Sequence, residues 1–199
     1  MINWENFENF FSTGIPPWLF YPSLLISGFL IVTALFSKRK KEKIIFVLCI
    51  LLIEYLFVVI CSTIICRPII ISRFEKIQLS LFWTYRAILA HTPGVSVWDI
   101  VMNVVLFLPL GFIVKLLFPS LSFGKMLLIA ISFSLCIETS QYVLEKGIAQ
   151  IDDVMHNAIG AMIGWWIARL TTFFIASVRI RTALHRKSII IKGTDVPSC

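Results

Sequence analysis

Long apolar runs separated by short polar connections dominate this sequence. Five such runs cover residues 18–36, 44–66, 100–118, 126–144 and 154–178. Each contains about 19 residues or more, which is the length that an α-helix needs to cross the hydrocarbon core of a bilayer. The runs do not alternate polar and apolar residues, as the strands of a membrane barrel would. The pattern therefore predicts an all-α, polytopic helical membrane protein with about five transmembrane helices.

The amino-acid composition agrees with this pattern. Of the 199 residues, 58% are hydrophobic and only 15% are charged, which is not the composition of a soluble domain. Residues 1–43 are expected to hold an amino-terminal outer segment, the first transmembrane helix and a basic cytoplasmic loop. Residues 44–178 would form the main membrane domain. A basic and loosely ordered cytoplasmic tail would follow over residues 179–199.

The longest connection, residues 67–99, lies between the second and third predicted helices. It mixes apolar and basic residues, which favours a helix lying in the membrane interface or a re-entrant segment packed on the bundle. Three of its cations, Arg73, Lys76 and Arg86, could meet anionic head groups or phosphates. The alternative is that these side chains only snorkel from a membrane-surface helix to the water.

The distribution of Lys and Arg predicts the orientation. Most of them fall in the loop at 37–43, the turn near 119–125 and the tail, and a protein with five spans places all three on one side. Short loops rich in Lys and Arg face the cytoplasm, so the basic loop is a topology signal and we expect no nucleic-acid partner. The amino terminus, the 67–99 connection and the 145–153 loop would then lie outside.

Polar residues gather at the predicted outer ends of the apolar runs. Glu138 and Gln141 are three residues apart and share one helix face, and Asp153 and Asn157 are four apart at the start of the last run. An acid inside an apolar segment is costly, which makes it a functional-site hypothesis by default. The predicted binding residues are Asn103, Glu138, Gln141, Asp152, Asp153 and Asn157, with Asp99 at the same depth.

Several interpretations of these polar residues stay open. They could form a buried network that locks three helices together. In an enzyme, Glu138 or Asp153 would be the general base, but the chain lacks an evident nucleophile because Ser140 points away. Glu138, Asp152, Asp153 and His156 could be assembled into a metal site, yet no motif fixes that geometry, so we expect no metal and no cofactor. The orientation of His156 is left open.

Other single residues are expected to serve packing. Gly160 and Gly164 form a small-xxx-small pattern that lets helices approach closely. Pro109 and Gly111 lie in the middle of the third run, where Pro removes a backbone hydrogen bond and Gly allows close contact. Glu54, in the middle of the second run, is either paired with a polar group of a neighbouring helix or a proton or substrate group.

Three motifs carry a resemblance to a known family. ETSQ from Glu138 is followed by IDDVMHNAIGAMIG, which has the form IDDxxxNxxGxxxG, and DIVMNVVLFLPLGF precedes them. Together with QLSLFWTY from Gln78, they resemble the VanZ-like family of small bacterial membrane proteins over roughly residues 45–170. The sequence departs from the family pattern where many members have Arg at position 147 and Asp at position 150, because Gly147 and Gln150 stand there.

The resemblance implies a multi-pass protein of the bacterial cell membrane with a role in resistance to glycopeptide antibiotics, particularly lipid-tailed ones such as teicoplanin. The favoured hypothesis is a non-enzymatic protein of the cell envelope. It would bind a membrane lipid, a lipid-linked cell-wall precursor or a lipid-tailed antibiotic at the outer leaflet. The alternative is an intramembrane enzyme that modifies a lipid or precursor head group with Glu138 and Asp153 as acid–base groups. The oligomeric state is not predicted.

Overall fold

A computed structural model gives the fold of the chain. It describes the backbone of residues 17–35, 40–67, 69 and 77–194, and the side chains of 21–32, 42–67, 69, 77–178, 181 and 182. The predicted amino-terminal outer segment, most of the basic loop at 37–43, Arg73 and Lys76 lie outside these residues.

Each of the five apolar runs forms a helix, as the pattern predicted. The helices are α2 (Pro17–Leu35), α3 (Lys40–Ile60), α5 (Val97–Leu117), α6 (Phe123–Val143) and α7 (Ile151–Thr194), and α3 is extended by the short π-helix η1 (Cys61–Ile65). Among the described residues, four helical segments are long and apolar enough to cross a membrane: 42–65, 97–117, 123–143 and 151–178. Within α2, the residues with described side chains form a shorter apolar helix, Tyr21–Val32. The chain is therefore an all-α polytopic membrane protein.

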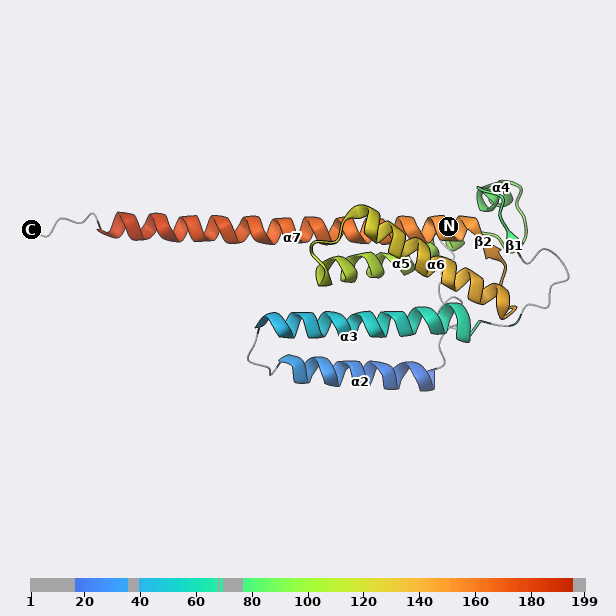
Figure 1. The fold of residues 1–199 in the computed structure, drawn as a ribbon, viewed down its shortest axis with the longest axis horizontal. Coiled ribbons are helices and arrows are strands. Elements are labelled where there is room, and N and C mark those ends of the chain that lie inside the picture. Colours follow the sequence, from blue (N-terminus) through green and yellow to red (C-terminus); the bar gives the residue numbers. More distant parts are fainter. Residues whose placement is uncertain (1–16, 36–39, 68, 70–76, 195–199) are drawn as a thin grey trace, which may run out of the picture.

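The helices run in alternating directions and form an elongated bundle (Figure 1). The end of α3, the start of α5, the end of α6 and the start of α7 meet at the end of the bundle that carries α4 (Trp83–Leu89). We call this the α4 end. The turn between α5 and α6 lies at the opposite end, beyond which α7 projects. One end of the bundle therefore carries the described parts of the three basic segments, which are the start of α3, the turn 119–125 and the extension of α7, and the other end carries the described part of the long connection.

The described part of the long connection contains little helix. Ile77–Gln78 forms strand β1, which pairs in parallel with β2 (Ala149–Gln150), and only α4, with seven residues, is helical. This pairing joins the connection to the loop before α7, more than 70 residues further along the chain. The connection is thus held on the α4 end by backbone hydrogen bonds as well as by side chains.

The expectation of a loosely ordered tail was wrong. Helix α7 continues past the membrane-spanning part to Thr194, a helix of 44 residues. At 1.5 Å per residue it is roughly 66 Å long, about twice the hydrocarbon thickness of a bilayer. The sequence from Trp165 to Lys192 contains no Gly and no Pro, so nothing in it ends a helix.

Helices α5 and α7 make the most extensive contact in the bundle, and glycines allow it. A Cβ at Gly160 would lie 2.1 Å from the carbonyl oxygen of Val104, and one at Gly164 would lie 2.0 Å from that of Leu108. From the other side, a Cβ at Gly111 would overlap the backbone of Ala161. Any larger residue at these positions would force the two helix backbones apart.

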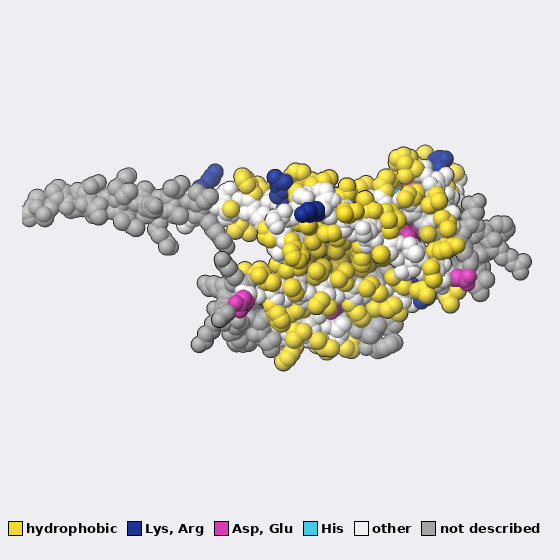
Figure 2. Space-filling model, viewed as in Figure 1, with side chains coloured by type: hydrophobic (Ala, Val, Ile, Leu, Met, Phe, Trp, Pro, Cys, Tyr) yellow, Lys and Arg dark blue, Asp and Glu magenta, His cyan; other side chains and the backbone are white. Residues whose placement is uncertain are grey.

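The apolar core lies between α3, α5, α6 and α7. Val59, Phe107, Met126, Ala130 and Trp165 are among its most buried members. Outside the core, hydrophobic side chains cover most of one face of the bundle, with few charged side chains among them (Figure 2). Such a surface is stable against lipid tails and not against water.

Glu54 is paired with the neighbouring helix α2. Its carboxylate accepts hydrogen bonds from the hydroxyls of Ser23 at 2.8 Å and Ser27 at 2.7 Å. The two serines are four residues apart on one face of α2, so both reach the same acid. This acid joins the first two helices, as the pairing interpretation of the sequence expected, and it belongs to none of the polar groups at the α4 end.

Candidate functional site at the α4 end of the bundle

The polar residues that the sequence singled out are brought together at the α4 end, but they form separate groups. Glu138 on α6 and Asp153 on α7 lie close enough for their charges to interact. Asp152 and His156 face α4, on a different side of α7. Asn157 lies one turn deeper in the bundle. Neighbouring residues on a helix project about 100° apart, which is why the adjacent acids Asp152 and Asp153 take part in different groups.

Glu138 lies near the end of α6 and is only 6% exposed. Its carboxylate accepts a hydrogen bond of 2.9 Å from the backbone N–H of Gln150, the last residue of β2. Through this bond the acid fixes the loop that leads into α7. Asp153 then approaches Glu138 from the first turn of α7. A half-buried carboxylate, that of Asp153, therefore lies within electrostatic range of the buried carboxylate of Glu138.

Three further groups surround this pair of acids. The amide of Asn103 on α5 forms a hydrogen bond with the Asp153 side chain, and the Arg67 guanidinium lies close enough to attract both carboxylates. The negative charge of Asp99, one turn before Asn103, also repels that of Asp153. The Asp99 carboxylate itself accepts a hydrogen bond of 2.7 Å from the backbone N–H of Ser96. One guanidinium thus faces a larger number of carboxylates, and the group has an excess of acid.

Sequence reasoning missed Arg67, which was not among the predicted site residues. The guanidinium lies beside Gly147, since a Cβ at that glycine would be 3.4 Å from Nη1 of Arg67 and 3.4 Å from Oε1 of Gln141. Position 147 is where the family resemblance leads one to expect an arginine. Here a cation reaches the same place from the end of α3, and a long side chain at 147 would compete with it for space.

Gln141 and Lys146 serve the end of the π-helix. The Gln141 amide donates to the carbonyl of Thr63 at 3.0 Å, and the Lys146 ammonium donates to the carbonyl of Ile65 at 2.6 Å. These carbonyls lie in the last turn of η1, where a helix leaves backbone acceptors without partners. Both side chains therefore attach α6 and its loop to α3, just behind Arg67.

Asp152 is the N-terminal cap of another helix. Its carboxylate, 2% exposed, accepts hydrogen bonds from the backbone N–H groups of Phe82 at 2.7 Å and Thr84 at 2.8 Å. Both donors lie at the start of α4, and Phe82 has a left-handed backbone with φ of 61°. The side chain of Asp152 therefore bonds to α4 rather than to the helix that carries it.

His156 is buried and faces α4 as well. Its Nε2 lies 2.9 Å from the Tyr85 hydroxyl, and Nδ1 is buried without a hydrogen-bond partner. His156 and Asp152 thus stand on the α4 side of α7, while Glu138 and Asp153 stand on the α6 side. The set of four that could have formed a metal site is divided, and no group of three such ligands occurs in the part of the chain that the structure describes.

Asn157 binds inside the bundle rather than at its surface. Its amide nitrogen donates to the Ser134 hydroxyl on α6 at 2.8 Å, and its amide oxygen is buried without a partner. Ser134 lies one helical turn before Glu138 on the same face of α6. The spacing of four residues between Ser134 and Glu138 could have identified Ser134 as a residue of this face. Serine is common in membrane helices, however, so Ser134 did not stand out in the sequence.

The arrangement can hold a polar ligand but shows no activated nucleophile among these groups. Carboxylates accept hydrogen bonds from amines and hydroxyls, and a guanidinium donates to anions. The Ser140 hydroxyl donates to the carbonyl of Cys136 in its own helix at 2.7 Å. The Ser140 hydroxyl is therefore not directed at the acids. The sequence had suggested that it points away from them.

Comparison with known proteins identifies one family. The family model for VanZ/LLP1 matches residues 44–174, about two thirds of the chain. The match contains all the helices that build the α4 end, from α3 to the membrane-spanning part of α7. No curated protein and no solved structure is significantly similar to the chain.

Proposed function

Because the chain belongs to the VanZ/LLP1 family, we propose that it acts in resistance to lipid-tailed glycopeptide antibiotics such as teicoplanin, by binding a ligand at the outer leaflet of the bacterial cell membrane. Family membership supports a VanZ-like membrane protein linked to glycopeptide resistance. The binding activity and its site are our inference from the geometry of the α4 end.

The pair of acids, Glu138 and Asp153, carries this proposal. A packing device for helices needs hydrogen-bonding side chains, and Asn157 with Ser134 supplies one deeper in the bundle. A second acid placed near the buried Glu138 is costly for the fold, and a neutral side chain could form the bond that Asp153 makes with Asn103 on α5. Acids retained at such a cost are more common at binding and catalytic sites.

The composition of the group suggests the ligand class. An excess of carboxylates over guanidinium favours a ligand that presents amine or hydroxyl groups, while Arg67 can hold an anionic part of the same ligand. Because the group lies at the end of membrane-spanning helices, the rest of the ligand would extend into the bilayer. A lipid-linked cell-wall precursor and a lipid-tailed antibiotic both combine a polar head with an apolar tail.

We infer the orientation of the bundle from its basic end. Lys115 lies in the last turn of α5 and Lys125 in the first turn of α6, and the turn between these helices lies at the end opposite α4, as does the basic extension of α7. Cations of this kind stay in the cytoplasm. With the basic end inside, the acid pair faces the outer leaflet. This is the side on which glycopeptides and exported wall precursors meet the membrane.

An enzyme that uses the same acids is the alternative. Glu138 or Asp153 would then act as the general base on a lipid or precursor head group. The binding function is favoured because Ser140 is bonded to its own helix and the acid pair contacts amides and a guanidinium rather than a nucleophile. The two functions differ in their products, since only an enzyme changes the pools of lipids and wall precursors.

The test is survival under a lipid-tailed glycopeptide in cells that carry Glu138→Gln or Asp153→Asn. Both changes nearly keep the shape and the hydrogen bonding of the side chain but remove its charge, so resistance should fall to that of cells without the protein. The amount of protein in the membrane, measured in parallel, should stay near normal. Glu145→Gln is the matched control, because Glu145 is an exposed acid at the same end of the bundle.

Two results would contradict the proposal. Full resistance in both variants removes the acids from the site, and a loss of protein in step with the loss of resistance makes them structural. The lipid and precursor profile of the same cells separates the two functions. Unchanged pools with altered retention of the drug at the membrane indicate binding, and a new or missing species indicates an enzyme.

A further inference from the structure

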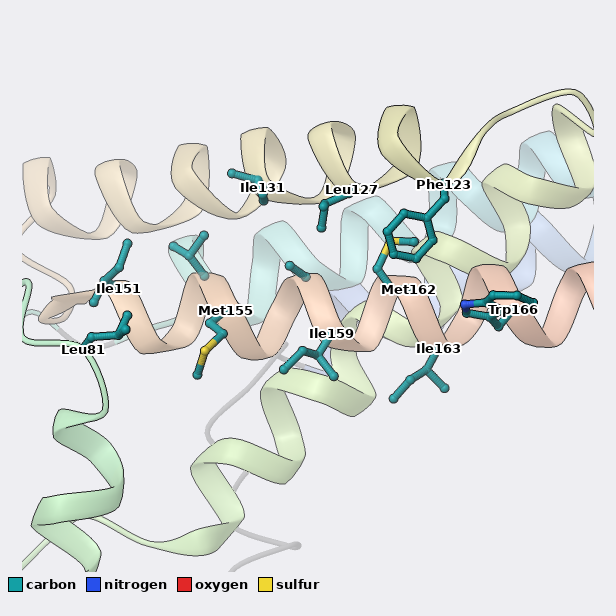
Figure 3. Close-up of a pocket in the computed structure, with 12 residues that line it drawn as sticks. Leu81, Phe123, Leu127, Ile131, Ile151, Met155, Ile159, Met162, Ile163 and Trp166 are labelled. Atoms are coloured by element: carbon teal, nitrogen blue, oxygen red, sulfur yellow. The ribbon is translucent and has the colours of Figure 1, made fainter.

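An apolar groove of about 660 Å³ runs between α6 and α7, on a different face of α7 from the acid pair. Leu127 and Ile131 line it from α6, and Met155, Ile159, Met162 and Trp166 line it from α7 (Figure 3). The lining residues of α7 recur at intervals of three and four, so they form one continuous stripe of the helix. The volume falls within the range of about 300–1,000 Å³ that is usual for ligand sites.

The depth of the groove limits what can fill it. Its α7 side extends from Ile151 to Trp166, within the membrane-spanning part of the helix. Over these sixteen residues the helix rises roughly 22 Å, which is most of the thickness of about 30 Å of the hydrocarbon core. A groove with apolar walls at this depth takes up a hydrocarbon chain, because water cannot be hydrogen-bonded there.

The mouth of the groove at the α4 end carries a cation. Leu81 lines the groove beside Ile151 (Figure 3), and the Arg86 guanidinium donates to the carbonyl oxygen of Leu81 at 3.2 Å. Arg86 is exposed, and with this one bond among the described residues most of the donors of its guanidinium have no partner there. A guanidinium prefers phosphate and carboxylate partners because it donates to two oxygens at once.

From this arrangement we propose that the groove binds one acyl chain of an anionic phospholipid, whose phosphate is held by Arg86. Charge at the mouth and hydrocarbon along the walls match the two halves of such a lipid. Met155 and Met162, with flexible thioether side chains, let the walls adapt to chains of different shape. The site does not depend on the proposed function, because it uses neither Glu138 nor Asp153.

The acyl chain is tested by filling the groove. Ile159→Trp places a large side chain in the groove, and Ile167→Trp is the matched control on the same helix outside the lining. The two isoleucines have similar exposed fractions of 45% and 41%. The protein is reconstituted in vesicles with spin-labelled phosphatidylglycerol or phosphatidylcholine, and electron spin resonance gives the fraction of motionally restricted lipid. Ile159→Trp should reduce that fraction for both lipids, and Ile167→Trp should leave it unchanged.

The head group is tested in the same vesicles. The wild-type protein should prefer phosphatidylglycerol by about fivefold, the ratio expected for one cation near an anionic head group. Arg86→Gln should abolish the preference, and Arg86→Lys should keep part of it. Lys125→Gln, which removes an exposed cation at the opposite end, should leave the preference intact.

Three outcomes would overturn this proposal. Equal restricted fractions in the two tryptophan variants would mean that the groove holds no lipid. An unchanged preference in Arg86→Gln would mean that the lipid bound there is not recognised through its phosphate. Cross-links between the cysteines of two Ile159→Cys chains, formed at the same protein-to-lipid ratio, would show that a second copy of the chain occupies the groove in place of a lipid. None of these measurements requires an antibiotic, so they are independent of the resistance assay.

Discussion

Removal of the Asp152 carboxylate should release α4 from the bundle while the transmembrane helices stay folded. In Asp152→Ala, the N–H groups of Phe82 and Thr84 lose their acceptor, and Thr84 is 3% exposed, so water cannot easily replace it. The left-handed backbone of Phe82 also loses the bond that holds it in place. No other described side chain is bonded to these two N–H groups.

The expected cost follows from the kind of bond that is lost. A hydrogen bond to a charged group contributes about 1.5–3 kcal/mol, and loss of an N-terminal cap costs about 0.5–2 kcal/mol. We expect a loss of about 2–4 kcal/mol in the free energy of docking α4, because relaxation of the exposed Phe82 recovers part of the two bonds. At 1.4 kcal/mol per factor of ten, the opening equilibrium of α4 rises by about 30- to 700-fold. Asp152→Asn keeps one acceptor oxygen and should lie between the wild type and Asp152→Ala.

Hydrogen–deuterium exchange of the protein in nanodiscs measures this opening directly. Peptides that cover Trp83–Leu89 should exchange faster in the order wild type, Asp152→Asn, Asp152→Ala, and peptides from α5 should not change. Asp153→Asn is the control, since this neighbouring acid faces α6 and should leave α4 protected. If α4 in Asp152→Ala exchanges as slowly as in the wild type, Asp152 does not hold α4 and the local geometry described above is wrong.

The bundle and its orientation lead to two further predictions. Gly160→Leu and Gly164→Leu should each destabilise the detergent-solubilised protein by about 1–3 kcal/mol or more, as is typical of overpacking, and so lower its melting temperature, while Gly124→Leu, with open space at its Cβ, should not. Normal melting of the first two variants would show that α5 and α7 do not meet there. Single cysteines at Lys40 and Ala149, in a chain without other cysteines, should react with impermeant maleimide from the inside and the outside of the cell respectively, and labelling from the same side would refute the five-span topology.

The hydrophobic pattern determined most of what the sequence revealed about the fold. Runs of about 19 apolar residues have few structural options in a bilayer, so the five helices could be placed within a few residues. The length of α7 could not be predicted in this way. A polar, helix-forming segment such as 179–194 becomes helical when it continues an existing helix, because the costly first turn is already formed. The strand pair β1–β2 also escaped prediction, since two residues on each side carry no readable alternation.

The candidate site was predictable in position but not in its contacts. The sequence places Asp152 and Asp153 side by side, and only the docking of α4 decides that one serves α4 and the other interacts with Glu138. Likewise, His156 had no readable partner, because Tyr85 precedes it by 71 residues in a segment with little periodicity. Contacts between a loop and a helix depend on long-range packing, which short-range spacing does not encode.

Arg67 supplies the cation that the family resemblance leads one to expect at position 147, where this chain has Gly147. The two carboxylates of Glu138 and Asp153 need a cation nearby, because like charges brought together in a region of low dielectric repel each other strongly. Gly147, which has no side chain, cannot supply it, yet its small size leaves the space in which the Arg67 guanidinium lies. The cation comes from Arg67, just after η1, and not from the loop before α7. It therefore connects the acid pair to the end of α3 and η1, where Gln141 and Lys146 bind the last carbonyls. In this chain, therefore, the charge balance of the acid pair depends on the position of α3, and if the pair binds a ligand as proposed, a movement of that helix would change the affinity without any change in the acids.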